Sequence, residues 1–302
     1  MKPAAIILLL ASCTSAAITP PPPPPSAPAP PSPPYLFTNP PQDTKTNTQT
    51  NTGFRIPTSR ESAVLGRRIL ALTPLGTIAT VFPADGASSA LENRPAGLGG
   101  MPHGLMEYIS DCETSEDEGN PTLLAITIET SFKNIAAGSN VSLAVQWTPP
   151  HPPAKRIQSL PSKLLSYLGL ASSKHTHAHN TPYSAANLPR FSILGHIAPI
   201  PASDDLTPGT SGAKLASCFV SAHPDARYWL PGSRVHESHF VRLVVEHIYW
   251  VGGFGDRAYI GWIPAAEWRN VTRAEWEAVR LPGEKKGWKE WTVDAFGGGS
   301  DL

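Results

Sequence analysis

The most informative segment of the chain is CFVSAHPDARYWLPGSRVHESHFVRLVVEHIYWVGGFGDRAYIGWIPAAEWRNVT, which runs from Cys218 to Thr272. Its central part, His239 to Val251, is rich in β-branched and aromatic residues, which predicts a long β-strand. A glycine-rich turn follows, and Ala258 to Ile263 form a second predicted strand. A final helix is predicted near Thr272 to Val279, where Thr272 and Glu275 can form a capping box.

The turn Gly253-Phe254-Gly255-Asp256-Arg257-Ala258 also matches the glycine fingerprint of dinucleotide-binding proteins. In those proteins the loop opens a helix whose N-terminus binds the pyrophosphate. Here the loop leads into a strand instead. The pattern is therefore interpreted as a hairpin whose glycines supply positive φ angles.

The residues before this segment predict further short strands separated by helices. An opening helix from Thr58 to about Thr73 begins with a capping box between Thr58 and Glu61. Strands are predicted at 76–82, near 105, at 123–128, 141–147 and 191–200, with a helical turn at 132–137 and a helix over about 209–221. About seven strands with peripheral helices predict one mainly β domain, a β-barrel, over residues 58–283.

The N-terminal residues predict export. Lys2, an apolar run and small residues form a signal peptide over residues 1–17, and the run is too short to span a bilayer. The alternative is a bacterial lipobox, Leu10 to Cys13, in which Cys13 would carry a lipid. Residues 18–57 are rich in Pro and Thr and predict a disordered stalk, while residues 284–302 predict a flexible tail.

Charge and composition narrow the partners. The chain carries 24 basic and 24 acidic side chains, so nothing attracts it to nucleic acid or to an anionic membrane. Residues 149–190 are rich in Pro, Ser and His and are interpreted as an inserted surface loop with one helical piece, IQSLPSKLLSYLGL. His175, His177 and His179 alternate there without a carboxylate or cysteine beside them, which favours a solvated loop over a metal site.

Export of the protein would make four residues candidates for covalent modification. Asn140 and Asn270 each begin an N-glycosylation sequon, Asn-Val-Ser and Asn-Val-Thr. Cys112 and Cys218 are the cysteines that remain after signal cleavage. In an oxidising compartment they can form one disulfide, and the alternative is a pair of buried thiols.

The C-terminal segment carries a resemblance to a known family. A helix ending in His223-Pro224-Asp225-Ala226 precedes the long strand, the turn Gly252-Gly253-Phe254-Gly255 and a strand that ends in Ile263-Pro264. These motifs, in this order, resemble the C-terminal part of CREG-type secreted glycoproteins and of the related pyridoxamine-phosphate-oxidase-like and haem-utilisation split barrels. The resemblance continues upstream through RESAVLGRRILALTPLGTIATV and TSFKNIAAGSNVSLAV, so it covers most of residues 58–272.

This resemblance implies a split β-barrel of the flavin-reductase and pyridoxamine-phosphate-oxidase type that pairs as a homodimer. In flavin-binding relatives the FMN lies between the subunits, and basic and hydroxyl side chains hold its phosphate. The resemblance places Lys133, Asn134 and the strand Gly76 to Phe82 at that site. It places Ile126 where those relatives carry a serine and Phe132 where they carry a threonine, and apolar side chains donate no hydrogen bond to phosphate.

Three hypotheses of function follow. The first is a secreted or vacuolar-lumen CREG-like glycoprotein, a non-enzymatic binding protein for an unidentified protein or small molecule, without cofactor or catalytic residue. The second is an FMN-dependent oxidoreductase that binds flavin at Lys133 and Asn134. The third is a haem-binding split barrel, which requires an axial histidine that the sequence does not single out.

Overall fold

The sheet of the computed structural model has seven strands, all paired in antiparallel fashion. Their order is β2-β1-β4-β5-β6-β3, and β7 also pairs with β6. The strands are β1 (Leu75–Val81), β2 (Pro102–Tyr108), β3 (Thr122–Ile126), β4 (Val141–Gln146), β5 (Arg190–Pro199), β6 (Ser238–Val251) and β7 (Ile260–Ile263). The mainly β fold predicted from the sequence is confirmed.

The structure describes residues 55–86, 94–113, 118–154, 184–255, 258–288 and 290. They belong to one unit, Thr44–Leu302, and the other unit, Met1–Asp43, lies outside the described residues. The predicted signal peptide, the lipobox, nearly all of the stalk, the helical piece of the insertion and its three alternating histidines also lie outside them.

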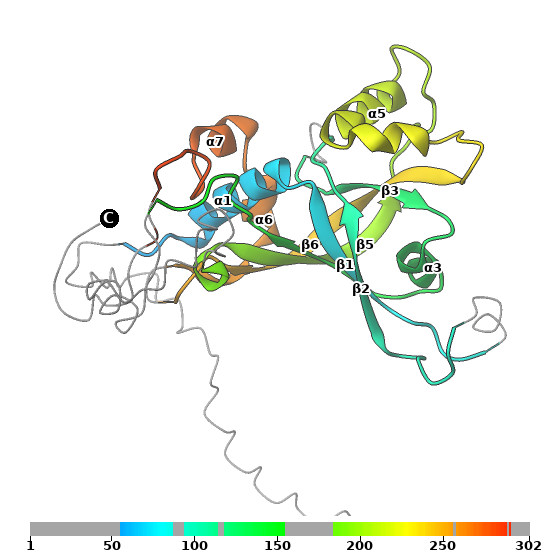
Figure 1. Ribbon diagram of the computed structural model, residues 1–302, viewed down its shortest axis with the longest axis horizontal. Coiled ribbons are helices and arrows are strands. Elements are labelled where there is room, and N and C mark those ends of the chain that lie inside the picture. Colours follow the sequence, from blue (N-terminus) through cyan, green and yellow to red (C-terminus); the bar gives the residue numbers. More distant parts are fainter. Residues whose placement is uncertain are drawn as a thin grey trace, which may run out of the picture. The chain divides into compact units, whose positions relative to one another are not determined.

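β6 is the longest strand, with 14 residues, and it joins the two parts of the barrel. Its first residues pair with β3 and its last residues pair with β7, while β5 follows it along the opposite edge (Figure 1). A bridge between Ser110 and Thr122 then connects the chain just after β2 to the start of β3. Their backbone N–H groups donate to each other's carbonyls at 3.0 and 2.7 Å. Because β2 and β3 lie at opposite ends of the strand order, this bridge closes the barrel.

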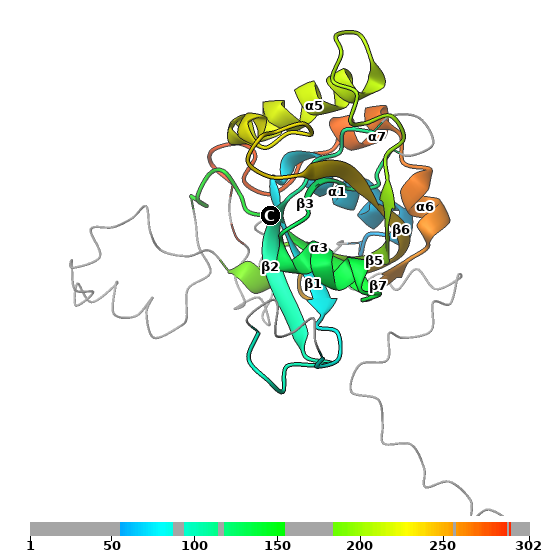
Figure 2. The same cartoon turned by 90° about the vertical axis from the view of Figure 1, so that its right-hand side faces the viewer.

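The helices lie around the barrel. α1 (Ser59–Leu72) begins with the predicted Thr58–Glu61 capping box and packs against α6 (Ala265–Arg269), α7 (Arg273–Ala278) and β7. α7 begins with the second predicted capping box. α3 (Thr130–Ala136) lies instead beside β1 and β2, as Figure 2 also shows. The main core joins α1 to the inner face of the sheet through Ile69, Leu70, Leu143, Ile248, Trp250 and Trp268.

Two local details differ from or refine the predicted elements. β2 begins at Pro102, earlier than the apolar pattern near Leu105 indicates, because its whole length pairs with β1 although most of its side chains are exposed. The turn after β6 is a hairpin into β7, as predicted, and Gly253 has the positive φ angle of 148° that its interpretation requires.

The His223-Pro224-Asp225-Ala226 motif attaches a second group of helices to the barrel. His223 is the C-cap residue of α5 (Ser211–Ala222) and is buried. Its Nε2 lies 3.0 Å from the Ile109 carbonyl oxygen and donates the hydrogen bond, because a carbonyl oxygen can only accept. Its ring stacks on Tyr108 at 4.4 Å, and the Tyr108 hydroxyl donates to Asp225 at 2.6 Å. These contacts hold η3 (Pro224–Tyr228) against the end of β2.

Candidate functional site

A cavity of about 230 Å³ lies between β2, β3 and the start of α3. Its lining comes from Met106, Glu107 and Tyr108 of β2, Leu124 and Ile126 of β3, Glu129 before α3, and Trp229 after η3. The cavity is smaller than the roughly 300–1,000 Å³ of pockets for drug-sized molecules. Two carboxylates, two aromatic rings and an apolar remainder therefore meet in a space for a small ligand.

Three separate elements position these side chains. β3 presents Leu124 and Ile126 through its pairing with β6, where Ile126 lies opposite Ser238. Glu129 is the N-cap residue of α3, in an extended conformation, and its side chain makes no capping hydrogen bond. Trp229 follows η3, and its carbonyl accepts a 2.6 Å hydrogen bond from the Ser238 hydroxyl. The pocket therefore exists only when the barrel and η3 are assembled.

The two carboxylates of the pocket influence each other. Burial and the neighbouring Glu107 carboxylate raise the pKa of Glu129 to about 7. Burial also raises the pKa of Glu107, and the neighbouring Ser131 hydroxyl acts in the opposite direction. Two half-buried carboxylates resist ionising together, because the second negative charge is repelled by the first. Glu129 is thus a carboxyl group that changes its charge near neutral pH.

This shift predicts a pH-dependent stability. The folded protein keeps the Glu129 proton up to about pH 7, whereas the ordinary value is 4.5. The contribution of Glu129 to the free energy of unfolding is therefore fully present below pH 4.5 and is lost as pH rises through 7, by about 1–2 kcal/mol once solvent screening is allowed for. We expect Glu129→Gln to remove this decline in urea unfolding measured between pH 5 and 8. Glu277→Gln, an exposed control, should leave the decline in place; identical pH curves for Glu129→Gln and the unmodified protein would contradict the assignment.

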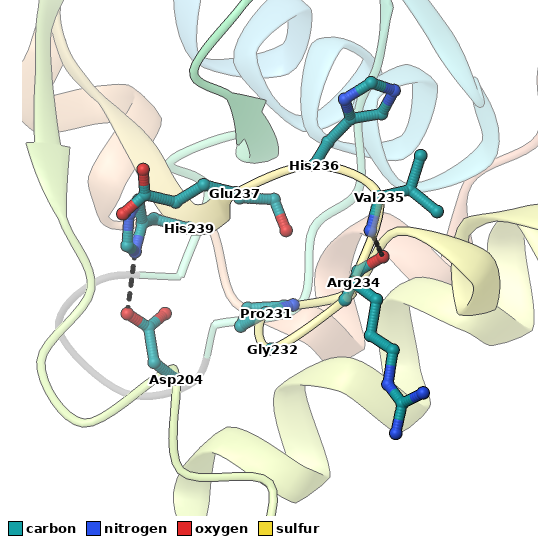
Figure 3. A pocket seen from close by; sticks show the side chains of 10 residues that line it. Asp204, Pro231, Gly232, Arg234, Val235, His236, Glu237 and His239 are labelled. Atoms are coloured by element: carbon teal, nitrogen blue, oxygen red, sulfur yellow. Dashed lines mark hydrogen bonds and ion pairs between the residues drawn. The ribbon is translucent and has the colours of Figure 1, made fainter.

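A second hollow, of about 350 Å³, is formed by Asp204 and the loop 231–239. Figure 3 shows Asp204 and His239 pointing toward each other, with Arg234 and His236 directed away from this pair. The distance from His239 Nδ1 to Asp204 Oδ2 is 2.8 Å, and this hydrogen bond raises the pKa of His239. Both side chains are about half exposed, at 47 % and 51 %. Exposed ion pairs of this kind contribute little free energy. The first cavity, which lies beneath Trp229 and contains the half-buried Glu107 and Glu129, is the stronger candidate.

The residues assigned to a flavin phosphate do not line this cavity. Lys133 is exposed on α3, and Asn134 is buried, with its Nδ2 donating to Thr80 Oγ1 of β1 at 3.0 Å. α3 and β1 do lie together, as the assignment requires, but the Asn134 amide is engaged within the protein. The phosphate role of these two residues stays a prediction.

The cavity does not suit a phosphate. Ile126 lines it and Phe132, 8 % exposed, packs in the core, so neither supplies a hydrogen-bond donor. The cavity's only carboxylate or cationic side chains are Glu107 and Glu129. A phosphate there would face negative charge, whereas phosphate sites use Arg, Lys, hydroxyls or backbone N–H groups. This cavity therefore does not fit the phosphate of FMN.

Sequence reasoning missed Glu107 and Glu129 as members of a site. A signal was present, since each acid follows a largely apolar stretch, LM before Glu107 and LLAITI shortly before Glu129. Burial of a charged residue in a strand, or at its end, costs free energy unless another group pairs with it. The sequence could not show that the two acids share a cavity.

The other predicted residues occupy these positions. Asn140 lies just before β4 and Asn270 ends α6, and both are exposed. Cys112, which follows β2, and Cys218 of α5 are joined in a disulfide with Cα atoms 5.8 Å apart. Across the described ranges, no three or more His, Cys, Asp or Glu side chains are grouped to hold a metal ion. No helix within those same ranges has the length and apolar character to cross a membrane.

The closed sheet, with β6 shared between β3 and β7, defines a split β-barrel of the flavin-reductase and pyridoxamine-phosphate-oxidase type. The profile described as "CREG, beta-barrel" matches residues 57–270, well over half of the chain. The protein belongs to the CREG β-barrel family. No curated protein matches the chain.

Solved structures also resemble the fold. A haem-binding protein from Mycobacterium smegmatis is 18 % identical with a TM-score of 0.41, and the match covers 70 % of this chain and 60 % of that one. ChuZ from Campylobacter jejuni is 12 % identical, with a TM-score of 0.36 and coverage of 63 % and 55 %. An FAD-binding protein from Mesorhizobium loti is 13 % identical, with a TM-score of 0.29 and coverage of 60 % and 87 %. All three TM-scores are below 0.5, so the ligands of these proteins are not transferred to this chain.

Proposed function

We propose that this protein is a non-enzymatic, dimeric split-barrel binding protein of the secretory pathway, either secreted or held in a vacuolar lumen. The observation that carries the proposal is the chemistry of the cavity beneath Trp229. The cavity is lined by two carboxylates, two aromatic rings and apolar side chains, and its lining includes no basic side chain that could bind the phosphate of FMN. The lining of this cavity suits a ligand other than FMN.

Export is supported by the surface positions of the modification sites. Asn140 and Asn270 are both exposed and their sequons fit glycosylation in the secretory pathway. The disulfide between Cys112 and Cys218 suits an oxidising compartment. The pKa of about 7 for Glu129 means that this residue contributes more to stability in an acidic lumen than at neutral pH.

Dimerisation is supported by the exposed apolar surface of the sheet edge. Leu105 and Met106 of β2 are 48 % and 71 % exposed, and Met101 beside them is 51 % exposed. Leu75 and Val81, at the two ends of the neighbouring strand β1, are also exposed. Exposed apolar residues concentrated on an edge strand are typical of a surface that another chain covers.

The haem alternative gains no support from the cavity. Haem iron in globins and peroxidases is held by a proximal histidine. None of the seven residues that line the cavity is a histidine, and the nearby His223 is engaged by the Ile109 carbonyl. The binding-protein function is therefore the one that the geometry favours.

Spectroscopy and mass together test this proposal. We expect protein purified from a eukaryotic secretory host to be colourless, to take up no FMN on titration, and to have about twice the mass of one glycosylated chain by light scattering. A flavin-binding split barrel purified in parallel provides the positive control. A yellow protein with near-stoichiometric flavin absorbance would refute the loss of the cofactor, and a monomeric mass would refute the dimer.

A further inference from the structure

The cavity beneath Trp229 carries negative charge that its lining does not balance. Glu107 and Glu129 both line it, and none of the other lining residues is basic. Within the described part of the chain, no basic side chain contributes to the pKa shift of either carboxyl group. These carboxylates are therefore available to a cation from outside the protein.

Glu129 also has an unused hydrogen-bond acceptor. Its Oε2 atom is buried and has no hydrogen-bond partner within the described residues. A buried polar atom without a partner is uncommon in folded proteins and costs free energy. A ligand that donates a hydrogen bond to Glu129, and carries positive charge between it and Glu107, would remove both the lost hydrogen bond and the repulsion.

The aromatic side chains indicate what kind of cation fits. Tyr108 and Trp229 line the same cavity as the two acids. The Tyr108 hydroxyl donates a hydrogen bond to Asp225, and the Tyr108 ring stacks on His223. These two contacts fix the position of the ring that lines the cavity. The faces of such rings attract organic cations. Leu124 and Ile126 complete an apolar surface for the carbon atoms of the ligand.

We propose that this cavity binds a small organic ammonium ion, with its charged nitrogen between Glu107 and Glu129 and its carbon atoms against Trp229 and Tyr108. This inference rests on the proposed function, because it names the ligand class of the same cavity. The volume of about 230 Å³ limits the ligand to a small amine or quaternary ammonium compound.

A bare metal ion fits this lining less well. Divalent cations such as Ca²⁺ take six to eight oxygen ligands, whereas the cavity offers two carboxylates and otherwise aromatic or aliphatic side chains. Apolar and aromatic walls would gain nothing from a hydrated metal ion. They do gain from burying the methylene or methyl groups of an ammonium compound.

Titration calorimetry on the full mature protein at pH 8 tests the inference. The probes are choline, n-butylamine, calcium chloride and 3,3-dimethyl-1-butanol, a neutral analogue of choline in which carbon replaces nitrogen. We expect saturable binding of at least one ammonium probe, at one per chain, with the neutral analogue bound at least tenfold more weakly. Equal affinity for choline and its neutral analogue, or binding of calcium without either ammonium probe, would overturn the inference.

Variants locate the binding. Glu107→Gln and Glu129→Gln preserve side-chain shape, and each should lower the affinity for the ammonium probe at least tenfold. Trp229→Leu should do the same. Glu277→Gln, which changes an exposed acid far from the cavity in the chain, should bind as the unmodified protein does. Unchanged affinity in both glutamine variants would place the cation elsewhere and overturn the assignment.

The inference and the proposed function fail in different ways. Uptake of FMN would refute the proposed function directly. A colourless, dimeric protein that binds neither ammonium probe would leave the proposed function intact and overturn the ligand class alone.

Discussion

Replacing Arg67 by methionine is expected to lower the free energy of unfolding by about 3–5 kcal/mol, the largest effect of any single substitution proposed for this protein. Arg67 belongs to α1, and its side chain is fully buried. It forms ion pairs with Asp111 at 3.4 Å and Glu118 at 3.1 Å. It also donates to the carbonyls of Trp268 and Val271, at 3.3 Å each.

The loss arises mainly from what methionine leaves behind. Asp111 is 4 % exposed, and burial already raises its pKa, while the charge of Arg67 acts in the opposite direction. Without the guanidinium, Asp111 becomes a buried carboxylate without its cation, and two carbonyls lose a donor. The damage therefore exceeds the value of the ion pairs themselves.

Urea unfolding with a matched control checks this expectation. Arg273→Met removes an Arg–Glu pair whose side chains are 71 % and 50 % exposed, so it should cost less than about 1 kcal/mol. The double variant Arg67→Met with Asp111→Asn should recover part of the loss, because the two residues act as a unit. If Arg67→Met cost no more than Arg273→Met, the buried network would not have the role assigned to it.

Removing the disulfide is expected to lower the free energy of unfolding by about 3–5 kcal/mol. Cys112 and Cys218 are 106 positions apart, and a crosslink across so long a segment restricts the unfolded chain strongly. It also fastens α5 to the chain just after β2. There it adds to the small core under α5, in which Phe219 of that helix packs with Leu124 of β3 and Phe240 of β6.

The paired substitution Cys112→Ser with Cys218→Ser provides the test. We expect its urea midpoint to fall, and the unmodified protein treated with a thiol reductant to unfold at the same lower midpoint. Reductant should have no further effect on the variant, which serves as the internal control. A reduced protein as stable as the oxidised one would contradict the stabilising role of the disulfide.

The sequence by itself determined the elements that depend on neighbouring residues. Both capping boxes, at Thr58 and Thr272, form as predicted because each needs only side chains three positions apart. The hairpin at Gly253 follows from glycine's freedom at positive φ and from the strand pattern on either side. The resemblance in the same segment pointed to the split barrel, which is the fold observed.

The tertiary structure alone decided how the chemistry is arranged. Glu107 and Glu129 meet because the Ser110–Thr122 bridge draws β2 beside β3, a contact that no local pattern encodes. Asn134 is directed to Thr80 rather than into the cavity by the position of α3 against β1. The number of cysteines left a disulfide and two free thiols as equal alternatives. The packing of α5 against the end of β2 brings Cys112 and Cys218 together in a disulfide. In each case the partners are distant in sequence, and only the closed barrel sets the distance between them.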